Sequence, residues 1–180
     1  MDRMAKAAVI AELIERLRQK GSWCGETHVQ KAVYILQNLM GVPLQFDFIL
    51  YKHGPFSFDL RDELTALRAD GLLRLETREL YGARIAATSQ SVYIREFYPR
   101  TLSRHNHAID FTSGQIGKKG VVELERLATA LYVTRQSGRQ ASIDNRVKKL
   151  VTLKPHIPEE DAQKAVSVVD HMIELAQDVS

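Results

Sequence analysis

The stretch from Lys52 to Leu60 constrains the fold of this chain most, because it joins an expected strand to an expected helix. The apolar run before it, residues 46–51, is interrupted only by Asp47 and predicts a short strand or an extended connector. A glycine followed by a proline favours a bend at this point, and the serine after them is a natural helix N-cap. We therefore interpret the stretch as a structural joint that holds the following helix in place, formed by His53, Gly54, Pro55, Phe56 and Ser57.

Apolar residues at spacings of three and four predict three helices in the first half of the chain. The first covers residues 4–17. The second covers residues 27–40, with Thr27 as its N-cap. The third covers residues 57–70 and is closed by Gly71. The first two are separated by a short turn, so they are expected to pack as a pair.

A hairpin is expected after the third helix. Residues 72–78 partly alternate between apolar and polar, residues 81–82 favour a turn, and residues 83–88 return as a partner strand. Helix, helix, strand, helix, hairpin is the order of a winged helix-turn-helix domain. The predicted fold class is mainly α with a small β hairpin, a winged helix-turn-helix-like N-terminal half followed by packed C-terminal helices. We expect residues 1–90 to form the winged-helix-like core and residues 91–180 to pack on it in one compact domain.

The second half of the chain is predicted to be helical, although residues 91–111 are ambiguous. Residues 114–120 predict a loop, and helices are expected at residues 121–137 and 143–151. The last helix is expected to have Pro158 at its first position, followed by acidic residues that suit the positive end of the helix dipole.

The composition indicates a folded chain without disulfides. With 180 residues, 44% of them apolar, the chain is long enough to bury a core. Cys24 is the only cysteine, so a reducing cytoplasm is the simplest setting. Charged residues interrupt the N-terminal segment, and no apolar run reaches the roughly 18 residues that span a bilayer. We therefore expect a cytoplasmic protein with no signal peptide and no membrane contact.

Two motifs resemble those of a bacterial family. They are the segment from Lys31 to Gln37 and the segment from Phe48 to Ser57, with the leucines that follow the second. Together they resemble the YwgA-like proteins and the related Panacea (SocA-like antitoxin) domains, well over residues 25–73 and loosely elsewhere. The resemblance implies a compact, largely helical domain with winged-helix character, often found near toxin–antitoxin, phage or defence genes. It implies a protein partner such as a toxin or defence protein, and it carries over no catalytic residue.

The distribution of charge bears on DNA binding. The third helix holds more acidic than basic residues, which is unfavourable for insertion into a major groove. Positive charge gathers instead in residues 95–120 and 135–154, which could form one basic face if they lie together. A solvated surface, a nucleic-acid contact and a contact with an acidic protein all stay open, and the acidic final helix could pair with the second segment. The candidate nucleic-acid contacts in these segments and the hairpin are Arg74, Arg78, Arg84, Lys118, Lys119, Arg139, Arg146, Lys148 and Lys149.

Three other patterns suggest a phosphate-binding, metal-binding or catalytic site, but each falls short of what such a site needs. Residues 114–119 resemble a phosphate loop, yet the first glycine and the magnesium-binding hydroxyl are missing from their positions. The histidines in residues 105–110 lack a third or fourth metal ligand. Cys24 with His28 or His53 as a base would make a nucleophile, but a lone cysteine between helices favours a small buried side chain. We therefore assign no catalytic, cofactor-binding or metal-binding residue and expect no cofactor.

The preferred hypothesis is a non-enzymatic cytoplasmic regulator or antitoxin-like adaptor that acts by protein–protein interaction. The alternative is a DNA-binding transcriptional regulator that uses residues 95–120 and 135–154 and the wing hairpin, with salt-dependent affinity. An enzyme would be indicated only if the cysteine and its two histidines converged in a cleft. The oligomeric state stays open, since three apolar residues suit either a core or an interface: Met40, Phe46 and Phe48.

Overall fold

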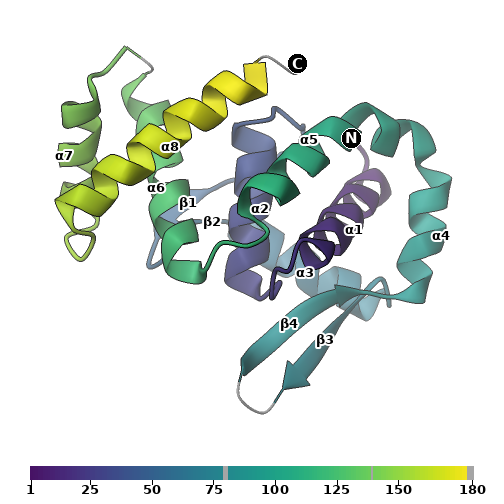
Figure 1. Cartoon of the computed structure of the whole chain (residues 1–180). Helices are drawn as coiled ribbons and strands as arrows, with labels where there is room; N and C mark the ends of the chain where they lie inside the picture. Colours follow the sequence, from purple (N-terminus) through teal and green to yellow (C-terminus); the bar gives the residue numbers. More distant parts are fainter. Residues whose placement is uncertain (79–80, 139, 178–180) are drawn as a thin grey trace.

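The computed structural model describes residues 1–78, 81–138 and 140–177, and these residues are mainly helical (Figure 1). The helices are α1 (Arg3–Gln19), α2 (Glu26–Asn38), α3 (Phe58–Ala69), α4 (Ser89–Phe97), α5 (Pro99–Ile116), α6 (Val121–Ser137), α7 (Ile143–Leu153) and α8 (Glu159–Gln177). The strands form two antiparallel hairpins, β1 (Ile49–Tyr51) with β2 (Gly54–Phe56) and β3 (Leu73–Arg78) with β4 (Tyr81–Ala87). The predicted fold class, mainly α with a small β hairpin, is confirmed.

The three helices predicted in the first half are present. α1 is capped by Asp2, whose side chain accepts a hydrogen bond from the amide of Ala5 at 2.8 Å. α2 begins at Glu26 with Gly25 as its N-cap, so the prediction that Thr27 caps this helix is wrong. Glycine is also accepted at an N-cap, and an acidic residue in the first turn suits the helix dipole, which favours the earlier start.

The joint between α2 and α3 is a hairpin rather than one strand followed by a bend. The predicted strand 46–51 is paired only over β1, and residues 54–56, expected in the bend, form β2 beside it. The turn lies at residues 52–53. A proline argues against a strand, but both strands of a two-stranded hairpin are edge strands, where proline is tolerated. As predicted, Ser57 caps α3 by accepting a hydrogen bond from the amide of Leu60 at 3.2 Å.

The β3–β4 hairpin occupies the place of the predicted wing. Its register pairs Leu73 with Ala87 and Leu75 with Ile85. The amide of Ile85 donates to the carbonyl of Cys24 at 2.8 Å, which attaches the hairpin to the segment between α1 and α2. Figure 1 shows the hairpin reaching away from the helices. The first half therefore follows the winged-helix order, with β1–β2 inserted between α2 and α3.

The second half contains α4 to α8. Residues 91–111 belong to α4 and α5, which are separated just before Pro99. The predicted loop 114–120 is wrong for its first residues, because α5 continues to Ile116. Glycine inside a helix costs only about 1 kcal/mol, which the packing of α5 outweighs. The helices α6 and α7 lie where expected, and Pro158 directly precedes α8 instead of occupying its first position.

α2 lies between two groups of helices. In Figure 1, α1, α3 and α4 lie on one side of it, and α6, α7 and α8 lie on the other. α5 packs on both α1 and α2, while α6 packs on α2 and on β2. α7 and α8 pack on α6 and on each other. The second half of the chain therefore packs directly on the first.

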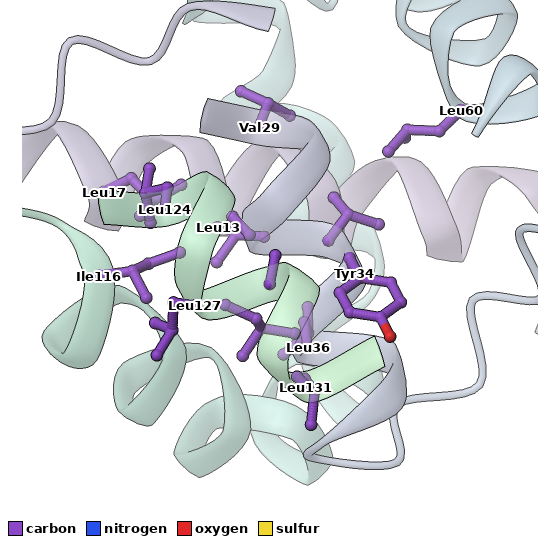
Figure 2. Packing of buried hydrophobic residues seen from close by; sticks show 14 of the residues in the cluster. Leu13, Leu17, Val29, Tyr34, Leu36, Leu60, Ile116, Leu124, Leu127 and Leu131 are labelled. Carbon is purple, nitrogen blue, oxygen red and sulfur yellow. The ribbon is translucent and has the colours of Figure 1, made fainter. Parts of the chain in front are cut away.

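One hydrophobic cluster runs through both halves (Figure 2). Residues 28–36 of α2 are all buried, including three polar side chains that need partners inside the protein. Phe46 is buried, and Met40 and Phe48 are partly buried against the cluster. The residues that Figure 2 labels come from α1, α2, α3, α5 and α6, and they are Leu13, Leu17, Val29, Tyr34, Leu36, Leu60, Ile116, Leu124, Leu127 and Leu131.

Candidate functional site

Two buried lysines hold the β1–β2 turn. Lys31 of α2 is 1% exposed, and its ammonium group donates to the carbonyl of Pro55 at 2.8 Å. Lys154, which follows α7, is also buried and donates to the carbonyls of Tyr51 and Lys52. A buried ammonium group is costly unless oxygens accept its protons. The lysines and the turn carbonyls therefore stabilise each other.

The carboxylate of Glu125 in α6 lies beside these lysines. It is 3.1 Å from Nε2 of His156, 3.7 Å from Nδ1 of His53 and 3.8 Å from Nζ of Lys154. Glu125 is buried, whereas both histidines are exposed at its edge. We call Lys31, His53, Glu125, Lys154 and His156 the junction cluster, because they join α2, α6, the β1–β2 turn and the segment before α8.

Two further contacts fix the joint. Gly54 has a φ of +84°, and a Cβ there would lie 3.0 Å from Oγ1 of Thr129, so both the backbone and the space require glycine. Gln30 exchanges two hydrogen bonds with the backbone of Ser57, at 2.9 and 3.0 Å. The predicted joint of His53, Gly54, Pro55, Phe56 and Ser57 is therefore held by side chains of α2 and α6.

Burial limits what the junction cluster can do chemically. A catalytic lysine must reach its substrate, but Lys31 is enclosed and its ammonium group faces a backbone carbonyl. Within the described residues, no group of three or more histidine, cysteine, aspartate and glutamate side chains is placed to hold a metal ion. The arrangement favours a structural role, in which the cluster fixes the turn.

The stability of the protein should depend on the protonation of Lys31. Burial lowers the pKa of Lys31 to about 8, although Glu125 opposes this, while an unfolded lysine titrates near pH 10.4. Between these values the unfolded chain binds more protons, so stability should rise with pH, by up to about 3 kcal/mol. Urea unfolding from pH 7 to pH 10 should show wild type gaining this stability relative to Lys31→Met.

The matched control for this measurement is Lys148→Met, since Lys148 is exposed on α7. Its stability difference from wild type should not change over the same pH range. If wild type and Lys31→Met give parallel stability curves, Lys31 is not the group that titrates.

The wing arginines are engaged by one carboxylate. Arg74 and Arg84 both bind Glu76, with distances of 2.7 and 2.5 Å, and Arg18 of α1 lies 3.5 Å from it. The hydrogen bonds from Arg74 and Arg84 lower the pKa of Glu76 to about 2. Arg84 also lies over the ring of Trp23, 5.3 Å from its centroid. These two candidate nucleic-acid contacts are therefore already paired within the protein.

Arg146, another predicted nucleic-acid contact, lies inside the protein. It is 4% exposed, and its guanidinium donates to both carboxylate oxygens of Asp170 in α8 at 2.6 and 2.7 Å. It also donates to Oγ1 of Thr134 at 3.2 Å. A phosphate contact by Arg146 does not fit this burial. This ion pair joins the basic segment 135–154 to the acidic final helix.

The four candidate lysines differ in their surroundings. Lys118 and Lys148 are exposed, and neither forms an ion pair with another described residue. Lys119 pairs with a glutamate one turn along α6, and Lys149 is partly buried with Nζ 3.4 Å from a serine hydroxyl. Two arginines complete the set of candidates, and neither the side chain of Arg78 nor residue Arg139 belongs to what the structure describes.

The outward face of α3 is not basic. Arg61 pairs with the neighbouring Asp62 at 3.0 Å. Glu63 and Asp70 bind Arg3 of α1, at 3.0 and 2.8 Å. The acidic residues of α3 thus help to hold it against α1, which agrees with the expectation that this helix is poorly suited to a major groove.

Cys24, His28 and His53 have separate partners. The thiol of Cys24 is buried, 3.5 Å from the hydroxyl of Ser22, and burial raises its pKa, which disfavours the reactive thiolate. Nε2 of His28 is 3.3 Å from the carbonyl of Ile116, and burial lowers the pKa of this histidine. His53 faces the junction cluster instead. The three side chains therefore do not form a nucleophile with its base.

The histidines in residues 105–110 are not gathered into a metal site either. Arg16 of α1 binds the side chain of Asn106 at 2.6 Å and the carboxylate of Asp110 at 3.0 Å. The oxygen atoms that could have joined the histidines as ligands are thus used to attach α5 to α1.

Among the described residues, the two most exposed large apolar side chains form a surface on α4 that sequence reasoning missed. Phe97 is 82% exposed and Tyr93 is 65% exposed, one turn apart on the helix. They border a groove that reaches the start of α1. The spacing of four between two aromatics was the available signal, but the ambiguity of residues 91–111 concealed it. We call this groove the α4 surface, defined by Met4, Tyr93, Ile94, Phe97 and Tyr98.

A smaller aromatic group lies at the joint. The rings of Tyr51, Phe56 and Phe58 contact one another, with centroids 5.1 to 5.8 Å apart. Tyr51 and Phe58 are exposed, while Phe56 is partly buried. Phe56 and Phe58 therefore pack together where β2 meets the start of α3.

No protein-family model matches the chain, and no curated protein matches it. Among the helices that the structure describes, none combines the length and the apolar character that crossing a bilayer requires. The resemblance to YwgA-like and Panacea proteins stays a prediction.

Proposed function

We propose that the protein is a non-enzymatic regulator or antitoxin-like adaptor that binds another protein through the α4 surface. The observation that carries this proposal is the exposure of Phe97 and Tyr93 on adjacent turns of one helix. Contiguous exposed apolar side chains mark interaction sites, and aromatic residues are frequent hot spots. A cytoplasmic setting is part of the proposal, since the lone buried thiol needs no oxidising compartment.

The anchoring of α4 supports this proposal. Arg95 binds Glu12 of α1 at 2.9 Å, and Ile94 is partly buried against the core. The helix is therefore held by its inner face, and its outer aromatics are not needed to attach it. A groove beside an anchored helix suits an apolar segment of a partner protein.

DNA binding is the second candidate function, supported by Lys118 and Lys148, which are exposed and form no ion pair with another described residue. The pairing of Arg74 and Arg84 with Glu76 and the burial of Arg146 weigh against it. Phosphate contacts supply most non-specific DNA affinity, so this candidate would depend on these lysines and on Arg100 and Arg104 of α5, which are exposed and form no ion pair with another described residue.

Partner capture tests the α4 surface. Tagged wild type, the double variant Tyr93→Ser/Phe97→Ser and the control Val122→Ser, an exposed apolar residue at the start of α6, should be compared in native pull-downs and calorimetry. The double variant should weaken binding of the recovered protein by about 30-fold or more, as expected for the loss of aromatic hot spots. Equal binding by all three proteins would remove the α4 surface from the proposal.

A salt titration tests the second candidate. Binding to a duplex of arbitrary sequence should be weak, and Lys148→Glu/Lys149→Glu should leave it unchanged. A steep loss of affinity with salt that these substitutions diminish would instead make DNA binding the main account.

A further inference from the structure

A second pocket lies where the end of α2 meets the end of α6. It has a volume of about 350 Å³, and the loop before β1 forms its third side. Its walls carry four aromatic side chains, those of Tyr34, Phe46, Phe48 and Tyr132, together with Asp47 and Arg135. Small-molecule sites span roughly 300–1,000 Å³ and combine apolar walls with a few polar groups. We call this site the tyrosine pocket.

The hydroxyl group of Tyr34 forms no hydrogen bond with another described residue, and it is not among the side-chain atoms that are both buried and without a partner. Although Tyr34 as a whole is only 2% exposed, its hydroxyl oxygen is therefore accessible from the pocket that it lines. Figure 2 shows the hydroxyl pointing away from the side chains packed around Leu13. Burial raises the pKa of Tyr34, with Arg135 opposing and Tyr132 reinforcing the change, so the hydroxyl keeps its proton. The pocket therefore contains an O–H donor to which no described residue provides an acceptor.

Two opposite charges in the pocket are also unpaired. Arg135 donates to the carbonyl of Asn38 through Nη1, and it forms no ion pair with a described residue. The carboxylate of Asp47 is exposed and likewise has no cationic partner among the described residues. Since Arg135 and Asp47 line the same pocket without contacting each other, a ligand carrying both charges would complement them.

The loop that supplies Asp47 is held in place. Gln37 of α2 exchanges two hydrogen bonds with the backbone of Phe46, at 2.8 and 2.9 Å. Gln45 has a φ of +61°, a backbone region that costs a non-glycine residue about 1 kcal/mol or more and that clusters at ligand sites. The ring of Phe48 packs edge-on against Tyr34, with centroids 5.0 Å apart. The aromatic walls are therefore formed before a ligand binds, which lowers the cost of binding.

We propose that the tyrosine pocket binds a small zwitterion with a flat ring, the chemistry of a free aromatic amino acid. The ring packs among the aromatic walls, the carboxylate binds Arg135, the ammonium group binds Asp47, and Tyr34 donates its hydroxyl. A phosphate, which carries no cationic group, is disfavoured relative to a zwitterion, because Asp47 and the C-terminal ends of α2 and α6 all add negative charge here. This inference is independent of partner binding at the α4 surface.

Calorimetry with four probes tests the proposal on the wild-type protein. The probes are L-tryptophan, indole-3-propionate without the ammonium group, tryptamine without the carboxylate, and adenosine monophosphate. L-Tryptophan should bind at least 10-fold more tightly than the other three. No binding of L-tryptophan, or tighter binding of any other probe, would overturn the proposal.

Three variants assign the contacts. Arg135→Gln should lower the affinity for L-tryptophan to the affinity that wild type has for tryptamine. Asp47→Asn should lower it to the affinity that wild type has for indole-3-propionate. Tyr34→Phe should lower the affinity for L-tryptophan several-fold. The control Arg104→Gln, an exposed arginine of α5 outside the pocket, should bind like wild type. If the control and Arg135→Gln behave alike, the ligand does not use Arg135.

Discussion

Replacing Gly54 with alanine is expected to lower the free energy of unfolding by about 2–5 kcal/mol. Two costs add. The left-handed backbone at φ +84° costs a residue with a Cβ about 1–2 kcal/mol. The new Cβ would also lie 3.0 Å from Oγ1 of Thr129 and 3.4 Å from the carbonyl of Glu125, and overpacking in a core costs about 1–3 kcal/mol. Urea unfolding monitored by circular dichroism measures the loss.

Gly41→Ala separates the two costs. Gly41 has a similar φ of +69°, but no atom lies within 4 Å of its missing Cβ. This variant should lose only the backbone part, about 1–2 kcal/mol. Equal losses in the two variants would mean that the junction cluster accommodates a methyl group and that the close approach of α6 to the turn is not important for stability.

Replacing Arg146 with alanine is expected to cost about 2–4 kcal/mol. The change leaves Asp170 without the partner that binds both of its oxygens, and breaking a buried ion pair costs about 3–5 kcal/mol. The expected loss is smaller than for a fully buried pair, because the side chain of Asp170 is about one-third exposed. Thr134 loses a hydrogen bond as well. Thermal and urea unfolding should both show the loss.

Lys148→Ala is the matched control on the same helix. Lys148 is exposed and has no ion-pair partner in the described part of the chain, so its replacement should change stability by less than about 0.5 kcal/mol. The contrast also bears on function, since both residues were candidate nucleic-acid contacts. If Arg146→Ala kept wild-type stability while reducing binding to DNA, the internal ion pair would be unimportant and Arg146 would return as a DNA contact.

Much of the joint could be predicted from local sequence. The N-cap at Ser57 and the need for glycine at position 54 follow from residue chemistry, because caps and left-handed turns are local. The partners of the joint could not be predicted. Lys31 and Glu125 lie far from it in sequence, and nothing in their neighbours indicates that both are buried beside the same turn.

The two candidate surfaces also differ in how far local sequence predicts them. On α4, the spacing of Tyr93 and Phe97 places them on one side of a helix, but which side faces solvent depends on how α4 packs against α1. The tyrosine pocket has no local signal, since α2, the loop before β1 and α6 each contribute part of it. The segment that contains Tyr34 resembles a motif of a known family, but only the structure shows that its hydroxyl lacks a partner among the described residues.

The sequence by itself determined the first three helices, the last three and the wing hairpin, because apolar periodicity, caps and turns act over a few residues. It left α4 and α5 ambiguous and did not predict the pairing of β1 with β2. Only the tertiary structure decided what the charged residues do. Arg146 forms an ion pair with Asp170 inside the protein, and the wing arginines Arg74 and Arg84 both form ion pairs with Glu76. Charge pairing depends on which side chains come within about 4 Å, and that distance is set by the packing of elements far apart in the chain.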